Sequence, residues 1–150
     1  MEGALQKSVT LFRRLTSYDI QCVFEEASLR QVGAGETICS FGDPAEEFYV
    51  LLSGEAEADL AGGKGVEART VKIPPGELIG EVGVLMQGPR TATVRATGKC
   101  ELLVFDGEIL ENIINNHPRA AARLNFNLAR ALGRRMHQRT SQSGEWRALS

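Results

Sequence analysis

The chain has 150 residues, of which 43% are hydrophobic and 24% charged, and a formal net charge of −2. This length suits one domain with its own core, and no apolar run approaches the roughly 18 residues that a membrane-spanning helix needs. The first residues also lack the features of a secretory signal, so we expect a cytoplasmic protein without a membrane span. Cys22, Cys39 and Cys100 show no C-x-x-C spacing, which indicates buried free thiols rather than a disulfide framework or metal site.

Residues 9–27 form the first predicted element, a helical arm. Apolar residues recur there close to helical spacing. Ser17 and Asp19 are the candidates to cap a second short helix within this arm.

Residues 28–105 have the pattern of short antiparallel strands. Runs rich in valine, isoleucine, threonine and aromatic residues are separated by glycine, proline and aspartate turns. Small apolar and polar residues alternate over 56–60 and 92–96, which is typical of strands with one buried face. Together these patterns predict a mainly β fold, an antiparallel jelly-roll barrel of about eight strands.

Residues 106–140 are predicted to form two C-terminal helices. Asp106 can cap the first, and Pro118 suits the first turn of the second. We therefore expect one domain over 1–140 and a polar tail over 141–150.

The last helix carries a narrow apolar stripe. Leu124, Leu128, Leu132 and Met136 recur at every fourth position. Two interpretations stay open: the stripe packs on the domain's own barrel, or it pairs with a second copy in a homodimer.

The segment 76–93 interrupts the strand pattern and is the main candidate for a binding site. Gly80 permits backbone conformations closed to other residues. Residues 81–86 can form a short helix whose unpaired N–H groups attract an anion. Gly83 is unfavourable in so short a helix, which leaves two explanations, close approach to a ligand or tight packing.

Two charged side chains of this segment suit a sugar-phosphate ligand. Pro89 stiffens the chain before Arg90, whose guanidinium can bind two phosphate oxygens at once. The Glu81 carboxylate can accept hydrogen bonds from ribose hydroxyls. Together the two side chains indicate a site for a ribose that carries a phosphate.

These motifs resemble the cyclic nucleotide-binding domain, the module shared by bacterial cyclic-AMP receptor proteins, protein kinase A and G regulatory domains and cyclic nucleotide-gated channels. The resemblance covers nearly the whole chain. Residues 80–93 are similar to the family's phosphate-binding cassette, with Glu81 and Arg90 nine positions apart. Further similar motifs are Gly33-x-Gly35-Glu36, Phe41-Gly42-Asp43 and Phe48-Tyr49-Val50-Leu51-x-x-Gly54.

The resemblance implies a role for each cassette residue. Arg90 would bind the exocyclic phosphate oxygens, Glu81 the ribose 2′-OH, and Thr91 would add a hydroxyl. The backbone amides that would line the phosphate are those of Gly80, Val82, Gly83 and Ala92. At Gly83 the chain departs from the family, which usually has alanine there.

The resemblance leaves two nucleotides open. In this family a threonine directly after the arginine is often associated with cyclic GMP, through contact with a syn guanine, yet it also occurs in cyclic-AMP binders. Thr91 occupies that position but does not settle the choice. We expect cyclic AMP as the ligand and keep cyclic GMP as the alternative. No cofactor is expected.

Enzyme function is not expected. Small β-barrels include metal-dependent cupin enzymes, which need about three histidines and a carboxylate on their strands. This chain has only His117 and His137, both in predicted helices. It also shows no nucleotide-binding glycine motif of the enzyme classes and no nucleophile–base pair, so we predict a non-catalytic module without a metal site.

The basic C-terminal helix leaves other functions open. The chain has 18 acidic and 10 basic residues up to Asn116, but one acidic residue and seven arginines from His117 onward. The arginines could contact nucleic acid or an anionic membrane, or form a solvated face that complements the acidic barrel. Because the chain ends soon after Gln138, we expect no helix-turn-helix and no sequence-specific DNA binding. A scaffold that has lost its ligand is a further alternative.

We expect the module to act as a switch for a partner protein or a second copy. Ligand binding would move the C-terminal helix so that part of it covers the base as a lid, and the lid must then contact the ligand or cassette in one state. The lid candidates by position are Leu124, Leu128, Arg130 and Arg134, with Trp146 as a capping ring. The sequence does not identify an effector protein.

Overall fold

The computed structural model describes residues 5, 6, 8–60 and 67–143, with side chains up to residue 137. The strands in this part of the chain are β1 (Ser28–Val32), β2 (Thr37–Cys39), β3 (Glu47–Ser53), β4 (Ala56–Leu60), β5 (Arg69–Ile73), β6 (Leu78–Ile79), β7 (Thr93–Ala96) and β8 (Cys100–Asp106). They form two four-stranded antiparallel sheets, in the orders β1-β8-β3-β6 and β2-β7-β4-β5. This confirms the predicted eight-stranded jelly roll.

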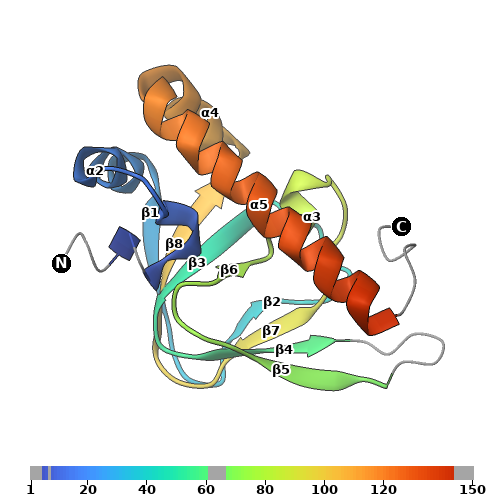
Figure 1. Cartoon of the computed structure of the whole chain (residues 1–150). Helices are drawn as coiled ribbons and strands as arrows, with labels where there is room; N and C mark the ends of the chain where they lie inside the picture. The colour runs from blue at the N-terminus through green and yellow to red at the C-terminus, as the bar shows by residue number, and fades with distance from the viewer. Residues whose placement is uncertain (1–4, 7, 61–66, 144–150) are drawn as a thin grey trace.

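Helices precede, interrupt and follow the strands. They are η1 (Thr10–Phe12), α2 (Ser17–Glu26), α3 (Glu81–Leu85), α4 (Gly107–Asn116) and α5 (Pro118–Ser143). Figure 1 shows α2 and α4 together at one end of the sheets, while α5 runs from there past α3. Because helix α5 ends at Ser143, it extends beyond the predicted domain boundary at residue 140. No described helix has both the length and the hydropathy of a bilayer span.

The N-terminal arm begins α2 with a capping box. The Thr16 hydroxyl accepts a hydrogen bond from the N–H of Asp19 (3.0 Å), and the Asp19 carboxylate accepts one from the N–H of Thr16 (3.1 Å). The prediction of Asp19 as a capping residue is confirmed. The prediction of Ser17 is wrong because the residue before it takes the extended N-cap conformation.

Strands β3 and β8 separate two hydrophobic cores. On β3, Phe48 and Val50 face the helices. The alternate residues Tyr49 and Leu51 face the second sheet. The rings of Phe48 and Phe105 stack at 5.1 Å between centroids, and each fully buried ring stabilises the fold by about 1.5–3 kcal/mol. The period-two pattern thus lets one sheet serve both cores.

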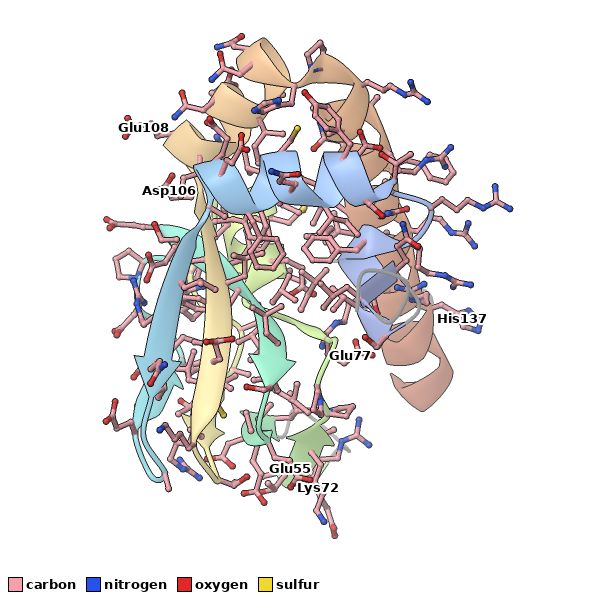
Figure 2. All side chains as sticks on the ribbon, turned by 90° about the vertical axis from the view of Figure 1, so that its left-hand side faces the viewer. Glu55, Lys72, Glu77, Asp106, Glu108 and His137 are labelled. Carbon is pink, nitrogen blue, oxygen red and sulfur yellow. The ribbon has the colours of Figure 1, made fainter. Side chains whose placement is uncertain are left out.

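The C-terminal helices start as predicted. Asp106 caps α4 by accepting a hydrogen bond from the N–H of Ile109 (2.8 Å), and Pro118 is the first residue of α5. Figure 2 shows Asp106 where β8 passes into α4.

The apolar stripe of α5 packs within its own domain. Leu124 and Leu128 are buried, but Met136 is 38% exposed. The buried part lies against η1, α2 and α4 as well as the sheet, so the expected packing on the barrel is incomplete as a description. A homodimer through this stripe would have to open that contact, because its buried residues already belong to the core.

All three cysteines are buried free thiols, as predicted. Cys22 lies in α2, Cys39 in β2 and Cys100 in β8. Burial raises the pKa of the Cys39 and Cys100 thiols, which keeps them in the unreactive neutral form.

Candidate functional site

A cavity of about 170 Å³ lies between α3, the second sheet and the C-terminal part of α5. Hydrophobic side chains from β4, β5 and β7 line one side of it. The other side holds all the residues that the sequence assigned to ligand binding: Gly80, Glu81, Val82, Gly83, Arg90, Thr91 and Ala92. The fold therefore brings these seven residues of the predicted cassette to one cavity.

Gly80 begins α3 in a conformation that requires glycine. Its φ of +79° lies in the left-handed region. A Cβ at this position would also collide with the guanidinium of Arg90. The glycine thus allows the turn into α3 and makes room for the arginine.

Tight packing accounts for Gly83. A Cβ there would lie 2.6 Å from the Cβ of Ala45 and 3.1 Å from the carbonyl oxygen of Pro89. The Gly83 carbonyl also accepts a hydrogen bond from the N–H of Gly88 (2.9 Å). Of the two explanations that the sequence left open, packing against the neighbouring loops is the one that the geometry supports.

The backbone of Arg90 is held on both sides by the loop before β3. Its N–H donates to the carbonyl of Asp43 (2.8 Å), and its carbonyl accepts from the N–H of Gly42 (3.0 Å). Pro44 and Pro89 form a β-bridge beside them. This pairing fixes where the arginine side chain enters the cavity wall.

The Arg90 side chain is buried, with 6% of its surface exposed. Its Nη1 donates to the carbonyl of Gly80 (3.3 Å), and its guanidinium lies over the Tyr49 ring at 5.7 Å. Among the described residues, no carboxylate forms an ion pair with it. A buried cation without a directly paired carboxylate is unfavourable, so this position favours an anion in the cavity.

Tyr49, whose ring contacts the Arg90 guanidinium, belongs to a hydrogen-bonded group that was not predicted from the sequence. Its hydroxyl donates to Oε1 of Glu47 (2.8 Å), and Arg30 binds the same carboxylate through two nitrogens (2.6 and 3.2 Å). Burial raises the pKa of Tyr49 to about 12, and the hydrogen bond to Glu47 adds to this effect. The Arg30 hydrogen bond lowers the pKa of Glu47. The only signal in the sequence was the i, i+2 spacing that puts Glu47 and Tyr49 on one face of β3.

Glu81 is paired with α5. Its carboxylate is only 2% exposed, and its Oε1 lies 3.1 Å from Nε of Arg135. Arg135 also donates through Nη2 to the carbonyl of Leu78 (2.9 Å). The residue predicted to receive the ribose thus already contacts the helix predicted to move.

Arg135 was predicted only as one of the basic residues of the last helix and not as a residue of the site. The apolar stripe was extended in steps of four residues, which drift by about 40° per step from the α-helical period. Following 3.6 residues per turn, the buried face passes from Leu128 through Ala131 to Arg135. That spacing was the signal that could have found it.

Most of the lid candidates lie away from the cavity. Leu124 and Leu128 are core residues, and the Arg130 guanidinium lies over the ring of Phe126 at 5.8 Å. Arg134 lines an adjoining cavity of about 210 Å³ that Glu81 and Arg135 also line. Trp146 lies outside the described residues.

The histidines contribute nothing to the cavity. Figure 2 shows His137 projecting outward from α5, and Nε2 of His117 lies 4.0 Å from Glu26. Over the described ranges, no group of three histidine, cysteine, aspartate or glutamate side chains could hold a metal ion.

Known proteins are similar to this chain in sequence and in fold. Residues 29–117 match the family described as the cyclic nucleotide-binding domain. The chain is 33% identical over 129 residues to a protein of Rhodopseudomonas palustris named as a potassium channel, covering 86% of this chain and 31% of that protein. It is 30% identical over 141 residues to the cAMP-dependent protein kinase regulatory subunit of Mycosarcoma maydis, covering 94% and 25%. The catabolite activator protein of Thermus thermophilus superposes with a TM-score of 0.77 at 27% identity, over 90% of this chain and 62% of that one.

Proposed function

Since the chain belongs to the cyclic nucleotide-binding domain family, we propose that it is a regulatory module that binds a 3′,5′-cyclic nucleotide beside α3 and passes this event to α5. The observation that carries the proposal is the buried Arg90, which lines the cavity and has no ion pair with a described carboxylate. The module itself is non-catalytic and works in the cytoplasm.

The charge of a cyclic phosphate matches this arginine. A cyclic phosphodiester carries one negative charge, and its two exocyclic oxygens suit the two parallel N–H bonds of a guanidinium. A 5′-monophosphate carries nearly two negative charges at neutral pH. Its second charge would have no comparable partner in the cassette, so we expect the cavity to discriminate against it.

The ribose would act on the contact between the cavity and α5. A 2′-OH that donates to Glu81 shares or displaces the bond that the carboxylate makes to Arg135. Because a ligand shifts two states only by its different affinity for them, a contact that the ligand alters directly is the natural coupling point. Arg135 therefore replaces the earlier lid candidates as the residue through which we expect α5 to respond.

Cyclic AMP is the ligand we favour, with cyclic GMP as the alternative. Relatives such as the Mycosarcoma maydis protein are named as cAMP-dependent regulatory subunits. Thr91, which the resemblance associates with either nucleotide, is exposed at the cavity. The chain spans less than a third of the length of the curated relatives described above, so the regulated protein is not specified by them.

Titration calorimetry tests this function. The purified protein is titrated with cyclic AMP, cyclic GMP and 5′-AMP, with circular dichroism as the check that it is folded. We expect saturable binding of a cyclic nucleotide at one site per chain and much weaker binding of 5′-AMP. Folded protein that binds neither cyclic nucleotide would contradict the proposal and favour a scaffold without a ligand.

A further inference from the structure

A further pocket lies between α5 and the segment that contains η1, and it shares no lining residue with the cassette cavity. It has a volume of about 160 Å³, and its lining includes five arginines: Arg13, Arg14, Arg123, Arg130 and Arg134. The remaining lining residues are uncharged, and none of them belongs to the cassette cavity. Within the described residues, none of these arginines has an ion pair with a carboxylate. Five like charges around one small hollow repel one another unless an anion lies between them.

The protein holds this cluster together by defined contacts. Asn127, only 6% exposed, donates to the carbonyls of Leu11 (2.7 Å) and Arg13 (2.8 Å). These bonds tie η1 and the segment that follows it to α5. On the helix, residues 123, 127, 130 and 134 follow one face at steps of four, three and four. The arginines of the segment and of the helix are thereby brought to the same hollow.

Two further features set the directions of the side chains. Arg14 has a φ of +64°, a left-handed conformation that is unfavourable for a residue with a side chain. The guanidinium groups of Arg123 and Arg130 both lie over the Phe126 ring, at 5.6 and 5.8 Å. Residues held in such strained backbone conformations cluster at functional sites.

We propose that this arginine pocket binds a compact anion with several phosphate charges. Guanidinium groups bind phosphate oxygens through paired N–H bonds, and a single negative charge would offset only part of this cluster. The pocket therefore suits a polyphosphate, or a phosphorylated headgroup, rather than the singly charged cyclic nucleotide. A neighbouring hollow of about 490 Å³, also lined by Arg14, Arg119 and Arg123, offers room for a longer ligand. Asp19 lines that hollow, but its carboxylate is engaged in the capping box of α2.

The test uses inorganic tripolyphosphate and the variant Arg14→Gly. Glycine adopts a positive φ without strain, so this variant should melt at no lower temperature than the parent. We expect saturable binding of tripolyphosphate at one site per chain, weakened about tenfold by Arg14→Gly. The double variant Arg123→Gln/Arg130→Gln should weaken it further. The matched control Arg95→Gln/Lys99→Gln removes two positive charges from the barrel and should leave binding unchanged.

Vesicles distinguish the two sources of such an anion. Phosphatidylcholine vesicles with phosphatidylinositol 4,5-bisphosphate are compared with phosphatidylserine vesicles of equal charge. Binding of the bisphosphate vesicles that Arg14→Gly weakens assigns the pocket to a lipid headgroup, whereas binding of tripolyphosphate alone assigns it to a free anion. Absence of saturable binding in both arms, equal loss in the barrel control, or equal binding to phosphatidylserine would overturn the proposal. Cyclic AMP affinity should not change in Arg14→Gly, so the two sites can fail separately.

Discussion

The cassette wall and the α5 wall of the cavity are held in different ways. On the cassette side, backbone hydrogen bonds to Gly42 and Asp43 fix Arg90. A side chain at position 80 would collide with the Arg90 guanidinium. On the α5 side, the polar contacts at the cavity come from the side chain of Arg135, which is 44% exposed. Backbone pairing resists displacement, whereas the Arg135 side chain reaches the buried Glu81 from a half-exposed position and can move to solvent when a ligand takes its place. This difference fits the proposal that the cassette wall binds the ligand and the α5 wall responds to the binding.

The largest effect is expected from a substitution in the cassette wall. Arg90→Ala should weaken cyclic nucleotide binding by about 2–5 kcal/mol, because the bound phosphate would be buried without its cation. Calorimetry measures the loss, and thermal melts should show little change in stability. Arg95→Ala removes an arginine five residues away whose partner is Asp59, outside the cavity. Unchanged affinity in Arg90→Ala, or equal losses in both variants, would remove Arg90 from the site.

A smaller effect is expected at the contact between the walls. Glu81→Ala should weaken cyclic AMP by about 1.5–3 kcal/mol, the typical contribution of a hydrogen bond to a charged group. The 2′-deoxy analogue of cyclic AMP lacks the hydroxyl that Glu81 would accept from, so its affinity should hardly change. Equal losses for the two ligands would show that Glu81 does not receive the ribose 2′-OH.

The packing of the cassette wall can be tested by substitutions that change no charge. Gly83→Ala should cost about 1–3 kcal/mol of unfolding free energy, since its Cβ must displace Ala45. Adding Ala45→Gly should restore much of this loss, as a denaturation double-mutant cycle would show. Gly133→Ala, in α5 with no atom near the added Cβ, should instead stabilise the protein by about 0.5–1 kcal/mol. A loss in Gly83→Ala that Ala45→Gly does not relieve would contradict the packing explanation.

The smallest effect is expected at Glu47, in the hydrogen-bonded group of Arg30, Glu47 and Tyr49. Because Arg30 lowers the folded-state pKa of Glu47 below its ordinary value of 4.5, the pair stabilises the protein above that pH and the stabilisation is lost as the pH falls through the lowered pKa. Glu47→Gln should therefore cost about 0.2–1 kcal/mol at neutral pH and nothing at strongly acidic pH. Urea denaturation across this range measures it. Glu55→Gln, at the far end of the sheets from the helices (Figure 2), should show no such difference; a pH-independent loss in Glu47→Gln would contradict the assignment.

The two walls also differ in how well the sequence predicted them. The strands and the caps at Asp19 and Asp106 were predictable because they depend on local spacing, whereas the grouping of the cassette residues was implied by the resemblance to the family. Arg135 and Tyr49 were missed, since their roles depend on which elements meet in space. The burial of Leu124 and Leu128 against the N-terminal helices followed from tertiary packing that periodicity alone does not fix.

Hydrogen–deuterium exchange of the unmodified protein, with and without saturating cyclic AMP, tests the central claim most directly. If the cassette wall recognises the nucleotide and α5 reports it, exchange should change both in residues 80–93 and in the part of α5 from Ala131 onward, with 5′-AMP as the control that changes neither. A change confined to residues 80–93 would show binding without a response of α5 and would contradict the switch. No change in either segment would contradict the binding site itself.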